Sequence, residues 1–205
     1  MGYKAIFWDA DGVVLKSSRL FSEQLEIDHG IKTEILQPFF TGIFRQCSIG
    51  KADLKEELSK VIAGWGWKGT VEELMEYWFT KGTQIDQTVL DCVQTFCDMG
   101  VRCFMTTDQE KYRGEYLQNL LGNRKPFERV FYSGQIGAVK KDPMYYEHVY
   151  DALNQASRAP FSELIAKKDI LVVDDGEKNI ETARELGFET HFYTNLESLK
   201  RFLAE

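Results

Sequence analysis

Residues 6–14 read IFWDADGVV, an apolar run that ends in two aspartates, Asp9 and Asp11, and a glycine. The run is short and rich in β-branched and aromatic side chains, which predicts a buried β-strand. Side chains two positions apart share a face of a strand, so we expect both carboxylates to point the same way. Isolated Asp-x-Asp pairs are usually surface or turn residues, but this one follows an apolar segment, where unpaired acids are costly to bury. The pair therefore indicates a catalytic site, in which one carboxylate acts as the nucleophile and the other transfers protons.

Four other short segments share this β-rich character, and helical patterns separate most of the five. Between Leu90 and Cys97, for example, apolar residues recur every three to four positions, and Gly100 marks the expected helix end. Strands that alternate with helices predict an α/β protein with a parallel sheet covered on both faces. The expected strands are residues 3–8, 101–106, 129–132, 170–173 and 190–193.

Residues 15–85 form a long connection without a convincing strand pattern, so they should carry structure of their own. Asp53 with Glu56, and Thr70 with Glu73, have the spacing of helix-capping boxes. We therefore predict an all-helical insert over residues 15–85 and a core formed by residues 1–14 and 86–205.

A second acidic pair, Asp174 and Asp175, ends the apolar run ILVV at residues 170–173 and precedes a glycine. Ligands bind at the carboxyl ends of parallel strands, so this pair should lie near Asp9 and Asp11. Close carboxylates repel one another unless a cation neutralises them, and oxygen ligands suit a hard divalent ion such as Mg²⁺. The four aspartates are therefore the candidate metal site, with Asp174 and Asp175 supplying one direct ligand and one supporting hydrogen bond. The alternative is that the second pair caps the helix that follows.

Two hydroxyls and an ammonium complete the candidate site. Thr106 and Thr107 end the second expected strand, and Lys140 follows the glycine-containing residues 133–137. Lysine binds phosphate as a point charge. Alone, the threonines would be ordinary strand-end residues and the lysine a surface residue. Together with the aspartates they fill the roles that phosphoryl transfer requires: a nucleophile, cations around the phosphoryl oxygens and a proton donor.

The composition of the chain argues against several classes of protein and of binding partner. The 205 residues carry 25 Lys+Arg against 32 Asp+Glu, a net charge of −7, and no dense basic stretch, which argues against nucleic acid. No run of about 18 apolar residues predicts a membrane span, and the apolar run at residues 5–8 is shorter than we expect for a signal peptide. Four cysteines without CxxC spacing and three scattered histidines give no support for zinc. We expect a cytoplasmic protein with reduced thiols; the sequence does not indicate its oligomeric state.

The four motifs, residues 9–13, Thr106, Lys140 and residues 174–175, resemble in their order those of the haloacid dehalogenase superfamily, whose members are mostly phosphatases. The resemblance spans residues 3–193. It implies a Rossmann-like three-layer α/β/α core with a helical cap after the first strand. It also implies an aspartyl-phosphate on Asp9, with Asp11 protonating the leaving group and then activating water. Mg²⁺ would be held by Asp9, the backbone carbonyl of Asp11 and an acid of the last motif, for which Asp175 is favoured.

Two positions depart from the family pattern. Thr107 stands where asparagine is frequent, and Lys141 stands where proline is common, so the choice of Lys140 rests on its spacing from Gly137 and on Pro143. The expected substrate is a small phosphorylated metabolite such as a sugar phosphate. A phosphomutase and a non-catalytic regulatory protein are the alternatives. A dehalogenase would leave Asp11 without a leaving group to protonate.

Overall fold

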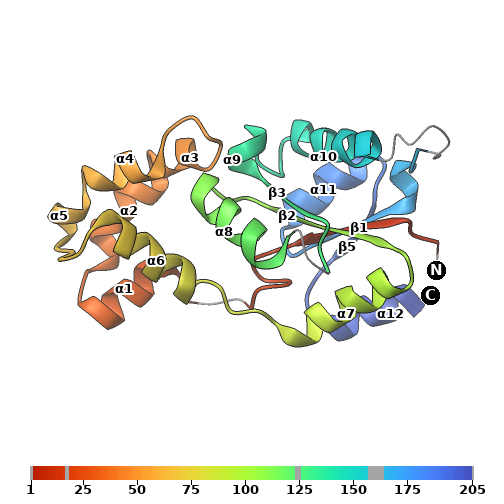
Figure 1. Cartoon of the computed structure of the whole chain (residues 1–205), viewed down its shortest axis with the longest axis horizontal. Coiled ribbons are helices and arrows are strands. Elements are labelled where there is room, and N and C mark those ends of the chain that lie inside the picture. Colours follow the sequence, from red (N-terminus) through yellow and green to blue (C-terminus); the bar gives the residue numbers. More distant parts are fainter. Residues whose placement is uncertain (1, 17–18, 123–125, 157–163, 205) are drawn as a thin grey trace.

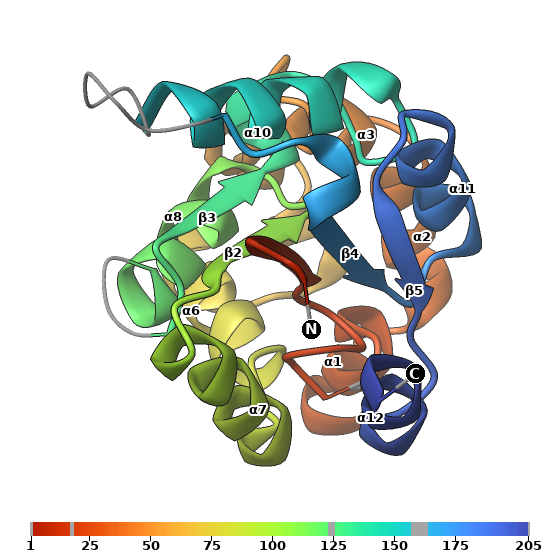
Figure 2. The same ribbon diagram turned by 90° about the vertical axis from the view of Figure 1, so that its right-hand side faces the viewer.

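A computed structural model describes residues 2–16, 19–122, 126–156 and 164–204. Its centre is a five-stranded parallel sheet in the order β3-β2-β1-β4-β5 (Figure 2). All five predicted strands are confirmed, with small shifts at their ends. The strands are β1 (Ala5–Asp9), β2 (Arg102–Thr107), β3 (Arg129–Tyr132), β4 (Ile170–Asp174) and β5 (Glu189–Phe192).

Strand β1 occupies the middle of the sheet, and all five of its residues are buried. Its side chains alternate between two apolar layers, because Ile6 and Trp8 enter one core cluster while Ala5 and Phe7 enter the other. Asp9 therefore emerges at the centre of the carboxyl edge of the sheet.

Helices cover both faces of the sheet, which confirms the predicted three layers (Figure 2). Helices α7 (Gln87–Asp98) and α12 (Leu196–Ala204) pack on the face of Ile6 and Trp8. Helices α10 (Pro143–Ala156) and α11 (Glu177–Glu185) pack on the other face. The remaining helical segments of the core are α8 (Lys111–Leu121), α9 (Ser133–Ile136) and the short 3₁₀ helix η1 (Lys167–Asp169).

The predicted insert is helical and lies at one end of the molecule, away from both termini (Figure 1). It has its own apolar cluster, which includes Leu36, Leu58 and Leu74. The Thr70 and Glu73 capping box is present, whereas the Asp53 side chain accepts from the backbone N–H groups of Lys55 and Glu56 but its own N–H makes no reciprocal hydrogen bond to the Glu56 side chain. The cap helices are α1 (Phe21–His29), α2 (Thr33–Thr41), α3 (Phe44–Cys47), α4 (Leu54–Ser59), α5 (Ile62–Trp65) and α6 (Val71–Lys81).

The cap connects to the core through two antiparallel segments. The N–H of Lys16 donates to the Gln84 carbonyl at 2.7 Å, and the N–H of Asp86 donates to the Val14 carbonyl at 2.9 Å. The chain thus leaves the sheet and returns to it beside the end of β1.

The cap also touches the core directly, so that it lies over the carboxyl edge of the sheet. Ser133 Oγ donates to the Ser48 carbonyl at 2.6 Å, and Tyr112 Oη donates to Asp53 Oδ2 at 2.7 Å. None of the helices in the described parts of the chain is long and apolar enough to cross a membrane.

Candidate active site

A cavity of about 1140 Å³ separates the cap from the carboxyl edge of the sheet. Asp9, Asp11, Lys140 and Asp175 line it on the core side. The opposite wall comes from the cap and includes aromatic side chains (Phe21, Phe40, Phe44 and Trp78).

Three acids meet at the core end of this cavity. Asp9 ends β1, Asp174 ends β4 and Asp175 follows it, and each offers a carboxylate oxygen within 4.8 Å of the others. Burial raises the pKa of the Asp9 carboxyl well above its usual value, against the opposing charge of Lys140. The structure therefore brings together residues from both acidic motifs.

Lys140 lies between two of these acids. Its Nζ is 2.5 Å from Asp9 Oδ1 and 2.7 Å from Asp174 Oδ2, and its backbone N–H donates to Asp108 Oδ1 at 2.8 Å. Burial by itself would lower the pKa of Lys140, but the charges of Asp9 and Asp174 outweigh it and raise the pKa. Lys140 is thus a fully charged, desolvated cation, whereas Lys141 is exposed.

The two acids of the last motif have different surroundings. Asp174 is fully buried, and its Oδ1 accepts from the Gly176 N–H at 2.7 Å and from Asn179 Nδ2 at 3.0 Å. Asp175 is exposed to the cavity. Helix α11 begins after Gly176 without a side-chain cap, so capping does not account for this acidic pair.

The donor set fits a hard divalent cation. Asp9, Asp174 and Asp175 offer only oxygen atoms, and the single ammonium of Lys140 cannot balance their charge. Gly12 adopts φ +85°, and a Cβ there would collide with the Asp175 carboxylate, so the loop after β1 passes directly against this acid. A cation at this point also favours the ionised form of Asp9.

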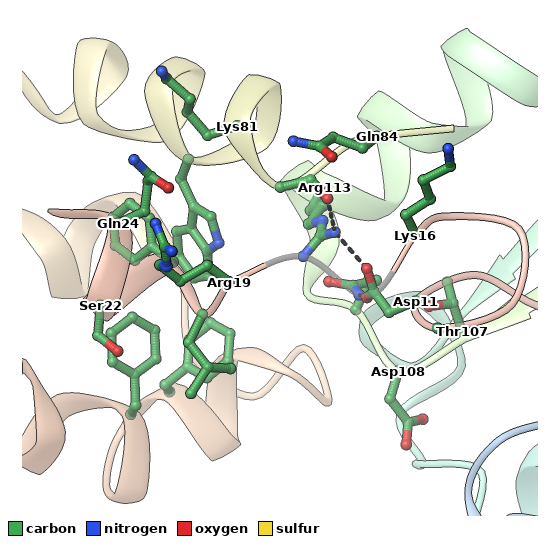
Figure 3. Close-up of a pocket in the computed structure, with 18 of the residues that line it drawn as sticks. Asp11, Lys16, Arg19, Ser22, Gln24, Lys81, Gln84, Thr107, Asp108 and Arg113 are labelled. Carbon is green, nitrogen blue, oxygen red and sulfur yellow. Dashed lines mark hydrogen bonds and ion pairs between the residues drawn. The ribbon is translucent and has the colours of Figure 1, made fainter. Parts of the chain in front are cut away.

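Asp11 does not join the three-acid cluster through its side chain. Its Oδ1 accepts from Arg113 Nη2 at 2.8 Å and its Oδ2 accepts from Gln109 Nε2 at 2.5 Å. Figure 3 shows the side chains of Asp11 and Arg113 pointing toward one another and joined by this contact. Any contact of Asp11 with the metal would therefore come from its backbone carbonyl.

The two threonines differ in position. Thr106 is fully buried within β2, and its hydroxyl donates to the Trp8 carbonyl at 3.4 Å. Thr107 lines the cavity, and its N–H donates to Tyr145 Oη at 2.9 Å. Tyr145 in turn donates to the Phe131 carbonyl at 2.8 Å, which fixes the end of β2.

Three cavity-lining residues were missed by sequence reasoning: Asp108 and Gln109 between β2 and α8, and Arg113 in the first turn of α8. Asp108 directly follows β2 and lies two residues beyond the end of the expected strand, so the rule that ligands bind at strand ends already pointed to its position. Gln109 and Arg113 belong to no motif in the sequence and are recognised only from their contacts with Asp11.

Residues 3–187 match the model of the haloacid dehalogenase-like hydrolase family, and the chain therefore belongs to this family of hydrolases. The resemblance carried by its four motifs is confirmed.

Individual relatives cover nearly the whole chain. The D-ribitol-5-phosphate phosphatase of Bacteroides thetaiotaomicron is 25% identical over 91% of this chain and 90% of its own length. The crystal structure of a haloacid dehalogenase family enzyme of the same organism has a TM-score of 0.77 at 18% identity, with full coverage of both chains. That enzyme is also known in complexes with magnesium and with magnesium and inorganic phosphate. A family hydrolase of Porphyromonas gingivalis has a TM-score of 0.74 at 20% identity, again with full coverage of both chains. These structures share the fold of this chain.

Proposed function

We propose that this hydrolase removes phosphate from a small sugar phosphate or polyol phosphate in a Mg²⁺-dependent reaction. The observation that carries the proposal is the buried carboxylate of Asp9, which lies at the centre of the sheet edge, paired with Lys140, and opens into the cavity beneath the cap. The similarity to a D-ribitol-5-phosphate phosphatase and the phosphate and magnesium complexes of a structural neighbour support it.

Asp9 is the proposed nucleophile. Its carboxylate attacks phosphorus, the bond to the ester oxygen breaks, and an aspartyl-phosphate forms. Asp9 Oδ1 accepts hydrogen bonds from the Ala10 N–H at 2.7 Å and from Lys140, which hold the carboxylate in one orientation. Such fixed orientation lowers the entropic part of the barrier.

Positive charge and proton transfer come from neighbouring groups. Lys140 neutralises phosphoryl oxygens as charge develops, and the Thr107 hydroxyl on the cavity wall offers a further donor. Asp11 gives its proton to the departing alkoxide and then removes one from the water that hydrolyses the aspartyl-phosphate.

Asp9, Asp175 and the Asp11 backbone carbonyl are the proposed holders of Mg²⁺. Both carboxylate oxygens of Asp174 already accept hydrogen bonds, from Gly176, Asn179 and Lys140. We therefore assign Asp174 to orienting its neighbours and not to direct metal binding. Bound there, the metal supplies charge that favours ionised Asp9 and stabilises the transferring phosphoryl group.

The cap wall suits the carbon skeleton of a sugar or polyol. Phe21 and Trp78 stack at 4.5 Å between ring centroids with 19° between their planes, and Phe40 lies edge-on to Trp78 at 5.5 Å. Together these rings form an apolar part of the cavity wall that can contact C–H groups, while Gln24 and Gln37 on the same wall offer amides to hydroxyls.

The test is phosphate release from sugar phosphates, polyol phosphates, nucleotides and phosphorylated acids, with and without Mg²⁺. We expect Mg²⁺-dependent turnover, highest for the first two groups, and its loss in Asp9→Asn. Normal turnover in that variant would rule out the mechanism. Recovery of an isomerised sugar phosphate instead of free phosphate would indicate a phosphomutase. Tight phosphate-ester binding without turnover would indicate a regulatory protein.

A further inference from the structure

The carboxylate of Asp11 is held from two sides by one short segment of the core. Arg113 Nη2 donates to its Oδ1 at 2.8 Å and Gln109 Nε2 donates to its Oδ2 at 2.5 Å. Asp11 itself lies in the loop after β1, and its side chain is 49% exposed to the cavity. Packing therefore does little to fix this carboxylate, and the two donors set its direction.

Arg113 is unusually placed for an arginine on a helix. Its side chain is only 10% exposed, and the same Nη2 that contacts Asp11 also donates to the Gly82 carbonyl at 3.1 Å. Gly82 directly follows α6, the last helix of the cap. The guanidinium is thus anchored at the cap exit while it contacts the acid.

Local structure directs Arg113 into the cavity. Glu110 caps α8, and its carboxylate accepts from the Tyr112 and Arg113 N–H groups at 2.7 Å and 2.6 Å. Gly114 permits a close approach, because a Cβ at this position would overlap the ring of Tyr132. The helix is thereby held against β3 with Arg113 toward Asp11.

Burial of this guanidinium has a cost that its contacts only partly offset. Its Nε is buried without a hydrogen-bond partner among the described residues. A charged group kept in this state is more readily explained by a role at Asp11 than by a gain in stability.

We infer that Arg113, together with Gln109, is a positioning residue that aims the Asp11 carboxylate at the leaving-group oxygen. The inference rests on the proposed function, in which Asp11 protonates the departing alkoxide. In the first step, formation of the aspartyl-phosphate, a misaimed acid slows only the departure of groups that need a proton, and general acid catalysis typically contributes about 10²–10⁴-fold. This step sets kcat/KM, whereas the later activation of water by Asp11 is common to all esters. The fall in kcat/KM on removing the Arg113 guanidinium should therefore depend on the leaving group.

The experiment compares kcat/KM of Arg113→Gln for an alkyl phosphate, ribitol 5-phosphate, and for p-nitrophenyl phosphate, whose phenolate leaves without a proton. We expect a fall on the order of 10²-fold for the alkyl ester and less than about 5-fold for the aryl ester. Asp11→Asn should show the same selectivity, and the double variant should lose little more than either single one. Arg113→Lys should recover part of the activity toward the alkyl ester.

Two further variants keep the test decisive. Gln109→Ala removes the second donor without touching the buried arginine, so it should show a smaller loss with the same selectivity. Lys111→Gln removes an exposed cation from the same helix and should leave both esters unaffected. Equal losses for the two esters in the Arg113 and Gln109 variants would assign these residues a purely structural role and overturn the inference. A wild-type protein that hydrolyses no sugar phosphate or polyol phosphate of the panel described above overturns the proposed function, and the inference with it.

Discussion

Lys140 Nζ lies 2.5 Å from Asp9 Oδ1, and both side chains are almost sealed from solvent, with exposures of 3% and 8%. The same ammonium reaches the fully buried Asp174 at 2.7 Å. One cation thus holds two desolvated carboxylates that end neighbouring strands. Stability and the geometry of the candidate active site consequently depend on the same ion pair.

Lys140→Met should destabilise the protein and abolish phosphate release. Removing one partner from a buried ion pair leaves uncompensated charge, at a typical cost of about 3–5 kcal/mol in the free energy of unfolding. Urea denaturation in the presence of a chelator measures this loss. Lys141→Met is the matched control, because Lys141 is exposed and should change the free energy of unfolding by less than about 0.5 kcal/mol. Similar losses in both variants would contradict the assignment.

Mg²⁺ should stabilise the wild-type protein, because a ligand that binds only the folded state adds about 2.7 kcal/mol at a hundredfold excess over its Kd. Asp175→Asn should remove this gain, since Asp175 is the acid of the last motif that faces the cavity. Glu181→Gln, an exposed change on α11, should preserve it. Thermal unfolding with and without Mg²⁺ is the measurement. A full Mg²⁺ response in Asp175→Asn would show that the metal lies elsewhere.

Gly12→Ala should eliminate Mg²⁺-dependent activity, because the added Cβ would displace the Asp175 carboxylate. Gly100→Ala provides the control: Gly100 has φ +84° against +85° at Gly12, but no atom lies within 4 Å of the position that its added methyl group would occupy. Both changes cost about 1–2 kcal/mol of backbone strain. Phosphate release should be lost in Gly12→Ala and retained in Gly100→Ala. Comparable activities of the two variants would contradict a role for the close approach of Gly12 to Asp175.

The sheet and much of the acid cluster were predictable from the sequence. The run at residues 170–173 is apolar and rich in β-branched residues, which predicts a buried strand. Parallel strands place the acids that follow them at the same edge of the sheet. In the structure, carboxylate oxygens of Asp9, Asp174 and Asp175 lie close together, as this rule predicts. The exact division of the chain into residues 1–14, 15–85 and 86–205 stays a prediction, as do the catalytic roles of the site residues.

Other contacts depend on tertiary geometry that no local pattern encodes. An arginine on a helix usually indicates a solvated face, and Arg113 reaches Asp11 only because Gly114 brings α8 close to Tyr132. Thr106 and Thr107 are equivalent as neighbouring hydroxyls in the sequence. They are distinguished only because β2 continues to Thr107, which places Thr106 inside the sheet and Thr107 at the cavity.

Gly50→Ala should weaken catalysis by preventing the cap from docking. Gly50 has φ +69°, and a Cβ there would collide with the backbone carbonyl of Gly134 in the core, which cannot rotate away as a side chain can. Small misplacements of catalytic groups cost up to about 10²-fold in rate. Gly30→Ala is the control, because Gly30 has the same φ but open space around it. Equal kcat/KM values for the two variants would show that this contact is dispensable.

Glu110→Gln should change how stability responds to pH. Burial raises the pKa of Glu110 from 4.5 to about 7, although hydrogen bonds from the Arg113 and Tyr112 N–H groups lower it; Arg113 and Asp53 are the nearby charges. Between these pH values Glu110 holds a proton in the folded state that it releases in the unfolded chain. The contribution of Glu110 to the free energy of unfolding therefore falls as pH rises from 4.5 to 7. The full effect is on the order of 3 kcal/mol.

Urea denaturation at about pH 4.5 and pH 7.5 tests this linkage. The free energy of unfolding of Glu110→Gln should rise relative to wild type between the two conditions, because glutamine stays neutral and pH effects at other groups cancel in the comparison. A difference that does not change with pH would contradict the raised pKa of Glu110.

The central position of β1 has a consequence for how the protein is made. Ala5 pairs with Arg102 on one side and with Ile170 on the other, so β1, the first strand of this sheet along the chain, acquires its second neighbour only after residues 170–173 have been made. Pairings so distant along the chain slow folding. The helical cap, whose apolar contacts are closer in sequence, would be complete much earlier. A nascent chain would therefore carry a formed lid before it possessed a site to cover.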